Sequence, residues 1–301
     1  MPDHLDPNTF GFLMPGGVRR RGLPDEQSMK THCPGILGGS SSLAVELRAA
    51  VMAAVESEGS VLLMGERGVG KERIARFIHA GSKAGNLPFE AVDCSRSFED
   101  ELEGVLLRLK EGSAGGTCYL SRCEELSLRL QGRLADYLEG SFPVRLLLSS
   151  PRNLASFTRA GLYSRRLFEG LSRSVITVPP LRRRMRDLGS LLDHQACELE
   201  GSPGGREFSP EAFGALATYP WPGNCLQLEA ALQGVLRATK GTVDLHDLPA
   251  GISGFWVGGA EAAEINRLRP HFGAEVDRFL LSRRLDSEPG TIESPHRNSG
   301  S

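Results

Sequence analysis

A glycine-rich loop that directly follows a short apolar segment constrains this chain more than any other feature of its sequence. Residues 61–64 are all apolar, and helical spacing of apolar residues begins again after residue 72. The loop between them reads Gly65-Glu66-Arg67-Gly68-Val69-Gly70-Lys71-Glu72. A strand, a G-x-x-x-x-G-K loop and a helix in this order are typical of a phosphate-binding site, because glycines let backbone N–H groups face phosphate oxygens and the lysine reaches the β- and γ-phosphates. We therefore predict that the residues from Gly65 to Glu72 bind ATP or ADP.

The loop has a second interpretation, which the sequence leaves open. It could be a relic that is kept for packing and no longer binds nucleotide. A Ser or Thr normally follows the loop lysine and offers its hydroxyl group to Mg²⁺, whereas this chain has Glu72. The two interpretations predict different responses to added nucleotide.

Short apolar runs alternate with helical stretches between residues 43 and 178. The runs lie at residues 61–64, 91–92, 118–120, 144–148 and 175–178. Such alternation predicts an α/β fold, in which a parallel sheet is covered by helices on both faces. After Pro179-Pro180 only helical patterns follow, at residues 187–200, 210–218 and 224–239, and these predict a small helical lid.

Proline, glycine and charge set the expected domain boundaries. Residues 1–34 contain prolines and glycines without any helical or alternating period, which predicts a flexible leader. The α/β domain is expected over residues 35–183 and the lid over residues 184–254. Residues 255–301 hold one amphipathic stretch before a tail rich in Ser, Pro, Gly and Asn, so we expect a terminal helix and a disordered tail.

Composition narrows the class of protein. Charged residues make up 24% and hydrophobic residues 40% of the chain, and the formal net charge is -2, as in an ordinary soluble globular protein. The arginine runs at residues 19–21 and 182–184 are short enough to be solvated faces rather than a DNA-binding surface. The 6 cysteines form no C-x-x-C pair and are expected to be small buried hydrophobes. No apolar run of about 18 residues occurs, so we expect no membrane contact and a cytoplasmic location.

A series of short motifs flanks the loop. They are Ile36-Leu37-Gly38, residues 74–79, Pro88-Phe89, Cys94, Gly115-Gly116-Thr117, residues 179–182 and Trp221-Pro222-Gly223-Asn224. In content and order they resemble the AAA+ domain of sigma-54-dependent transcriptional activators, the bacterial enhancer-binding proteins. The loop of that family also ends in Glu, so Glu72 fits it. The resemblance implies a P-loop AAA+ sheet domain followed by a helical lid.

The resemblance fails where the family carries the residues for hydrolysis. In the family, the strand after Gly-Gly-Thr ends in Asp-Glu, whose carboxylates hold Mg²⁺ and polarise the attacking water, whereas this chain has Ser121 and Arg122. A guanidinium group can neither bind a cation nor accept a proton. Glu124 and Glu125 follow, at positions expected to lie off the strand end. We therefore predict no catalytic residue, no metal-binding residue, and weak or absent Mg²⁺ binding.

Other residues of the family pattern are missing as well. The positions of the γ-phosphate sensor, the interface arginines and the lid arginine hold Pro151, Ser164, Gly170 and Leu226. Arg165 and Arg166 lie close enough in the sequence to substitute for the interface arginines. Residues 95–114 lack the family's G-A-F-T-G-A loop, and residues 252–301 lack a credible helix-turn-helix. Sigma-54 and DNA are therefore expected not to be partners.

These losses favour a degenerate, non-hydrolysing AAA+ regulatory protein. Such a pseudo-ATPase would act by binding, inhibiting or escorting another cytoplasmic protein, with ATP or ADP setting its conformation. One alternative is a transcription regulator of the sigma-54 activator family, and salt-sensitive promoter binding would support it. The other is a slow ATPase that a partner activates by supplying the missing groups, and ring-shaped assembly with stimulated ATP turnover would support it.

Overall fold

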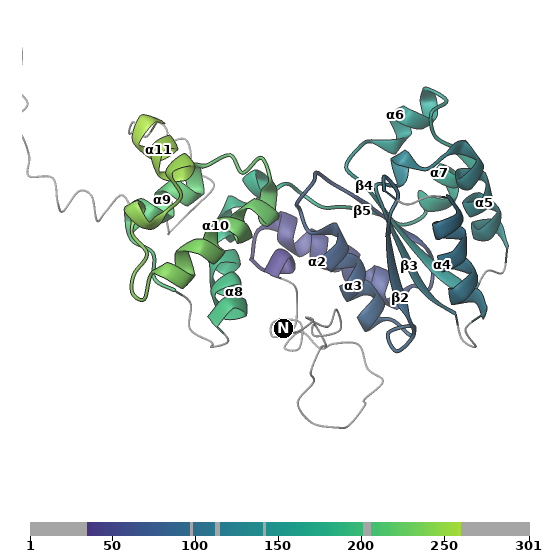
Figure 1. Ribbon diagram of the computed structural model, residues 1–301, viewed down its shortest axis with the longest axis horizontal. Helices are drawn as coiled ribbons and strands as arrows, with labels where there is room; N and C mark the ends of the chain where they lie inside the picture. Colours follow the sequence, from purple (N-terminus) through teal and green to yellow (C-terminus); the bar gives the residue numbers. More distant parts are fainter. Residues whose placement is uncertain (1–34, 97–98, 112–114, 141–142, 201–205, 260–301) are drawn as a thin grey trace, which may run out of the picture.

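An α/β domain and a helical lid lie side by side in the computed structural model (Figure 1). The structure describes residues 35–96, 99–111, 115–140, 143–200 and 206–259. The expected leader over residues 1–34 and the terminal helix and tail after residue 259 lie outside the described residues. The short helix η1 (Gly35–Leu37) opens the α/β domain.

The α/β domain is built on a parallel sheet with the strand order β2-β3-β4-β1-β5. Its strands are β1 (Val61–Met64), β2 (Phe89–Asp93), β3 (Gly116–Ser121), β4 (Val144–Ser150) and β5 (Val175–Thr177). Met64 pairs with Ser150 and Ser121 pairs with Ser149, so the carboxyl ends of β1, β4 and β3 meet at one edge. The predicted α/β fold class is confirmed.

Helices cover both faces of the sheet, and alternate strand residues pack against them. The helices α2 (Ser42–Glu56) and α3 (Lys71–Gly81) share one core with Leu63 and Leu147. The other core contains Leu62 and Leu148, and its helices are α4 (Glu99–Glu111), α5 (Leu128–Glu139), α6 (Leu154–Arg159) and α7 (Arg165–Leu171). The buried face of α4 consists of Leu102, Val105, Leu106 and Leu109, which is the apolar face that the sequence predicts.

Serine caps fix where several helices begin. The Oγ of Ser41 accepts a hydrogen bond from the N–H of Ala44 at the start of α2, and Ser127 caps α5 in the same way. Ser209 caps α9 (Pro210–Thr218), where Pro210 occupies the first turn. Each cap satisfies an N–H group that the helix itself leaves unpaired.

The lid follows the sheet without a break and has its own apolar core. Its elements are η3 (Leu181–Arg183), η4 (Met185–Asp187), α8 (Leu188–Glu200), α9, α10 (Asn224–Ala238), η5 (Leu245–Asp247) and α11 (Ala250–Gly259). Trp221 is fully buried in this core, and its Nε1 donates a hydrogen bond of 2.8 Å to the carbonyl oxygen of Leu216. The helix α11 runs across the boundary expected at residue 254, and Ile252 and Trp256 pack into the lid core.

The described cysteines occupy three kinds of environment. Cys118 and Cys123 are buried, as the sequence predicts, and Cys94 and Cys225 are partly buried. The prediction is wrong for Cys197, because this residue lies on the exposed side of α8.

None of the helices in the described part of the chain is both long and apolar enough to span a lipid bilayer.

Candidate nucleotide-binding site

The glycine-rich loop lies at the carboxyl edge of the sheet, between β1 and α3. The N–H of Gly65 donates to the carbonyl oxygen of Ser150, which ties the start of the loop to β4. Gly68 and Gly70 have φ angles of 76° and 87°, a region that favours glycine. A Cβ atom on Gly68 would also overlap the carbonyl oxygen of Gly223, and one on Gly70 would overlap the side chain of Ile36. The loop therefore has the tight, glycine-dependent curvature that a phosphate cradle requires.

Lys71 is held inside this loop. Its Nζ donates hydrogen bonds of 2.7 Å and 2.8 Å to the carbonyl oxygens of Gly65 and Glu66. Burial lowers the pKa of Lys71 from 10.5 to about 8, while the nearby carboxylate of Glu124 raises this pKa and the Arg67 guanidinium lowers it. Phosphate oxygens can replace both carbonyl acceptors, so the lysine is placed to bind an anion.

The lid clamps the loop through Glu66. The guanidinium group of Arg182 donates to the Glu66 carboxylate, with Nη1 at 2.7 Å from Oε2, and mainly this hydrogen bond lowers the pKa of Glu66 to about 2. The Nδ2 of Asn224 donates to the carbonyl oxygen of Arg67 at 2.8 Å and to Glu66 Oε2 at 3.2 Å. The N–H of Leu226 donates to the carbonyl oxygen of Gly68 at 3.0 Å. The side chain of Leu226 itself is 65% exposed.

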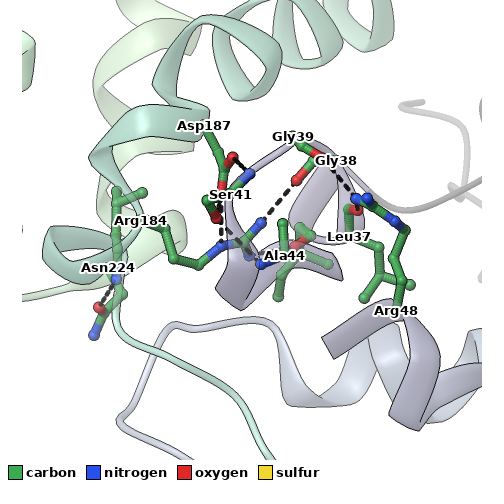
Figure 2. Close-up of polar contacts among 11 residues, drawn as sticks. Leu37, Gly38, Gly39, Ser41, Ala44, Arg48, Arg184, Asp187 and Asn224 are labelled. Carbon is green, nitrogen blue, oxygen red and sulfur yellow. Dashed lines mark hydrogen bonds and ion pairs between the residues drawn. The ribbon is translucent and has the colours of Figure 1, made fainter. Parts of the chain in front are cut away.

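A buried polar joint fastens the chain segment before α2 to the start of the lid (Figure 2). Arg184 is 2% exposed, and its guanidinium donates to the carbonyl oxygens of Ile36 and Gly38 and, at 3.3 Å, to Asp187. The carboxylate of Asp187 also accepts from the N–H and the Oγ of Ser41, at 2.9 Å and 2.6 Å. The expectation that residues 182–184 form a solvated face is therefore wrong for Arg184, because three oxygen acceptors compensate its burial.

The two positions that hold carboxylates in the related family carry none here. Arg122 follows β3 with a φ angle of 56° and turns sideways toward β2. Its Nε donates a hydrogen bond of 2.7 Å to Oδ1 of Asp93, and its Nη2 bonds to Oδ2 of the same carboxylate. Asp93 pairs with Ser121 in the strand register, so the ion pair spans the ends of two neighbouring strands. Arg122 is thus neutralised by Asp93.

Glu124 lies in the short helix η2 (Cys123–Glu125), past the end of β3 as expected, but its side chain turns inward. It is 8% exposed, and its Oε2 has no hydrogen-bond partner among the described residues. Its effect on the pKa of Lys71 places its carboxylate within electrostatic reach of the loop lysine. Glu125 is exposed. A two-residue offset in sequence therefore does not remove Glu124 from the site.

The remaining positions do not join the site. The Oγ of Ser150 accepts a hydrogen bond of 3.0 Å from the N–H of Arg152, which closes the turn after β4. Arg165 pairs with Glu169 on the exposed surface of α7. Arg166 bonds to carboxylates of α5 on the same surface. The structure brings together the loop, the lid clamp and Glu124. The sequence-based prediction missed the clamp, for which Asn224 in the Trp-Pro-Gly-Asn motif was the available signal, and it expected Glu124 to lie away from the site.

Comparison with known proteins assigns both parts of the chain. Residues 38–181 match the family model of the sigma-54 interaction domain, and residues 182–258 match that of the AAA+ ATPase lid domain. The nitrogen fixation protein VnfA of Azotobacter vinelandii is 30% identical over 259 residues, which cover 76% of this chain and 50% of VnfA. The transcriptional regulatory protein ZraR of Escherichia coli (strain K12) is 27% identical over 292 residues, which cover 87% of this chain and 65% of ZraR.

A solved structure is similar to this chain over both its α/β domain and its lid. The crystal structure of NtrX from Brucella abortus in complex with ADP superimposes with a TM-score of 0.61 at 25% identity, covering 86% of this chain and 64% of that chain. The chain thus spans about half to two thirds of the length of the relatives it matches.

These matches correct one expectation. Sigma-54 and DNA were expected not to be partners, because residues 95–114 lack one motif and residues 252–301 lack a helix-turn-helix. The match to the sigma-54 interaction domain and to transcriptional regulatory proteins overturns this exclusion. The missing motif is a local feature of a domain that matches as a whole. The missing helix-turn-helix carries no weight in a chain that spans only part of its relatives.

Proposed function

Because this chain belongs to the AAA+ domain family of sigma-54-dependent transcriptional activators, we propose that it is a nucleotide-binding regulatory module that acts in transcription. The observation that carries the proposal is the glycine cradle around Lys71, with α3 beginning at its rim. ATP or ADP fits this cradle, because its phosphates replace the carbonyl oxygens that now accept from Lys71. The helix N-terminus adds positive partial charge at the same place.

Nucleotide is expected to stabilise the native fold and to lose this effect when Lys71 is replaced by alanine. A ligand at 100 times its dissociation constant adds about 2.7 kcal/mol to the free energy of unfolding. A thermal-shift titration with ATP and ADP measures this gain. Lys83→Ala is the matched control, because the Lys83 side chain is 84% exposed and pairs with Glu58 on the surface. Equal stabilisation of the native chain and Lys71→Ala would show that nucleotide does not use this loop.

We further propose that this module hydrolyses ATP slowly and that bound nucleotide acts mainly by setting its conformation. Ser121 offers a hydroxyl group and Arg122 a neutralised guanidinium where hydrolysis needs carboxylates. The lid clamp supplies the route by which nucleotide reaches the rest of the molecule. When phosphates reposition the loop, the hydrogen bonds from Arg182 and Asn224 to its residues must rearrange with it.

Restoring the carboxylates is expected to increase ATP hydrolysis by at least about tenfold, since preorganised groups of this kind are worth orders of magnitude in rate. The variant is Ser121→Asp, Arg122→Glu and Asp93→Asn together, where the third change prevents repulsion between two adjacent carboxylates. Phosphate release is the measurement, and adding Lys71→Ala should abolish the gain. An unmodified chain that already hydrolyses ATP as fast as this variant would contradict slow hydrolysis.

A further inference from the structure

One buried carboxyl group near the loop has an oxygen atom without a hydrogen-bond partner among the described residues. Glu124 is 8% exposed, and the structure gives its Oε2 no hydrogen-bond partner among the described residues. A carboxylate that is buried without compensation costs several kcal/mol, and native structures retain few of them. Among the described side chains that bury a polar atom without a hydrogen-bond partner, Glu124 is the one that carries a carboxyl group.

The position of Glu124 suggests what that ligand is. It follows β3 at the carboxyl edge of the sheet, where Ser121 lies beside Ser149 of β4 and β4 in turn lies beside β1 and the loop. Its carboxylate acts on the pKa of Lys71, the residue that faces the phosphates in the proposed function. An oxygen ligand at this edge, close to phosphate oxygens, has the chemistry that a divalent cation such as Mg²⁺ prefers.

Other groups near Glu124 do not satisfy it. Burial raises the pKa of the Cys94 thiol to about 12, and the buried Cys123 thiol has its pKa raised further still, so both thiols are neutral at physiological pH. The hydroxyl group of Tyr163 is buried beside the Cys123 thiol and makes no hydrogen bond to Glu124. Arg122 is bound by Asp93. Lys71, whose Nζ bonds to two carbonyl oxygens, is the remaining cation that acts on Glu124.

We propose that Glu124 supplies the carboxylate that binds the divalent cation of a nucleotide in the loop, in place of Ser121 and Arg122. This inference rests on the proposed nucleotide site and adds to it a metal-directed residue that lies outside the family pattern. It also separates two roles. The chain keeps a carboxylate for the cation, while Arg122 occupies the position from which a carboxylate would polarise water. Mg²⁺-nucleotide binding without rapid hydrolysis follows from that separation.

The test compares Glu124→Gln with Glu125→Gln, a neighbouring exposed glutamate. ATP affinity is measured by calorimetric titration, once with EDTA and once with excess Mg²⁺. For the native chain and Glu125→Gln, Mg²⁺ is expected to increase the affinity for ATP. For Glu124→Gln this Mg²⁺-dependent gain falls by about tenfold, as for the loss of one metal-directed carboxylate, while the affinity in EDTA stays the same or rises. Mn²⁺ titrated with ADP and followed by electron paramagnetic resonance gives a second readout.

The free energy of unfolding of the nucleotide-free protein shows whether a loss of binding in Glu124→Gln comes from misfolding. Glu124→Gln replaces a buried carboxyl group whose Oε2 has no hydrogen-bond partner among the described residues, so the free energy of unfolding without ligand is expected to equal or exceed that of the native chain. An unchanged Mg²⁺-dependent gain in Glu124→Gln would overturn the proposal, as would equal losses in EDTA and in Mg²⁺. If the native chain binds ATP in neither condition, the proposed function itself fails, and this inference fails with it.

Discussion

Replacing Arg184 by methionine is expected to lower the free energy of unfolding by about 3–5 kcal/mol, the cost of removing one partner of a buried charge pair. The substitution leaves Asp187, which is 1% exposed, without its cation. It also takes away the donors to the carbonyl oxygens of Ile36 and Gly38. Urea denaturation followed by circular dichroism measures the loss.

Two further variants identify the cause. Arg183→Met changes an exposed arginine beside the joint and is expected to alter stability by less than about 0.5 kcal/mol. Adding Asp187→Asn to Arg184→Met should recover part of the loss, because the amide carries no charge and its oxygen can still accept one of the two hydrogen bonds from Ser41. A loss of less than about 1 kcal/mol for Arg184→Met alone would mean that the joint does not hold the lid to the segment before α2.

Replacing Lys71 by methionine is expected to stabilise the nucleotide-free protein at pH 7 by about 1–2 kcal/mol. The ordinary pKa of 10.5 falls to about 8 in the fold because burial disfavours the charged amine. This difference corresponds to a penalty of about 3 kcal/mol at most, part of which the lost hydrogen bonds to Gly65 and Glu66 offset. Equilibrium unfolding of the two proteins is the measurement. A less stable variant at pH 7 would contradict this interpretation of Lys71.

The same residue predicts a pH dependence. Between pH 8 and 10.5 the folded protein binds fewer protons at Lys71 than the unfolded chain does, so the penalty is full below pH 8 and is relieved as the pH rises. The advantage of Lys71→Met should therefore shrink by about 1.4 kcal/mol between pH 7 and pH 9. Burial raises the pKa of the Cys94 and Cys118 thiols to about 12, which lowers stability at high pH in both proteins. The difference between the two proteins cancels this shared effect. A constant difference across this pH range would refute the assignment.

Local patterns of the sequence predict most of the fold. The apolar runs at residues 61–64 and 144–148 become β1 and β4, and the four leucine and valine positions of α4 form its buried face. These features depend on spacing within one segment, which a single sequence displays. The loop could be located in the same way, because its glycines and its lysine are adjacent in the chain.

The rest of the site depends on contacts between distant segments. Arg184 looks like part of a solvated run, but it meets carbonyl oxygens that precede it by more than a hundred residues. The pairing of Arg122 with Asp93 follows from the register of β3 against β2, which the strands' sequences do not specify. Sequence alignment places Glu124 outside the site, because alignment counts residues along the chain and does not show that the side chain of Glu124 is buried in η2.

The clamp between the loop and the lid makes the two a single thermodynamic unit. Arg182, Asn224 and Leu226 all donate hydrogen bonds to loop residues, so neither part can move without changing bonds to the other. Thermodynamic linkage then applies to any protein that binds the lid. If such a protein changes the affinity of the loop for nucleotide by some factor, nucleotide must change the affinity for that protein by the same factor. Under the proposed function, the affinity of this chain for a protein bound to its lid would therefore vary with the concentrations of ATP and ADP.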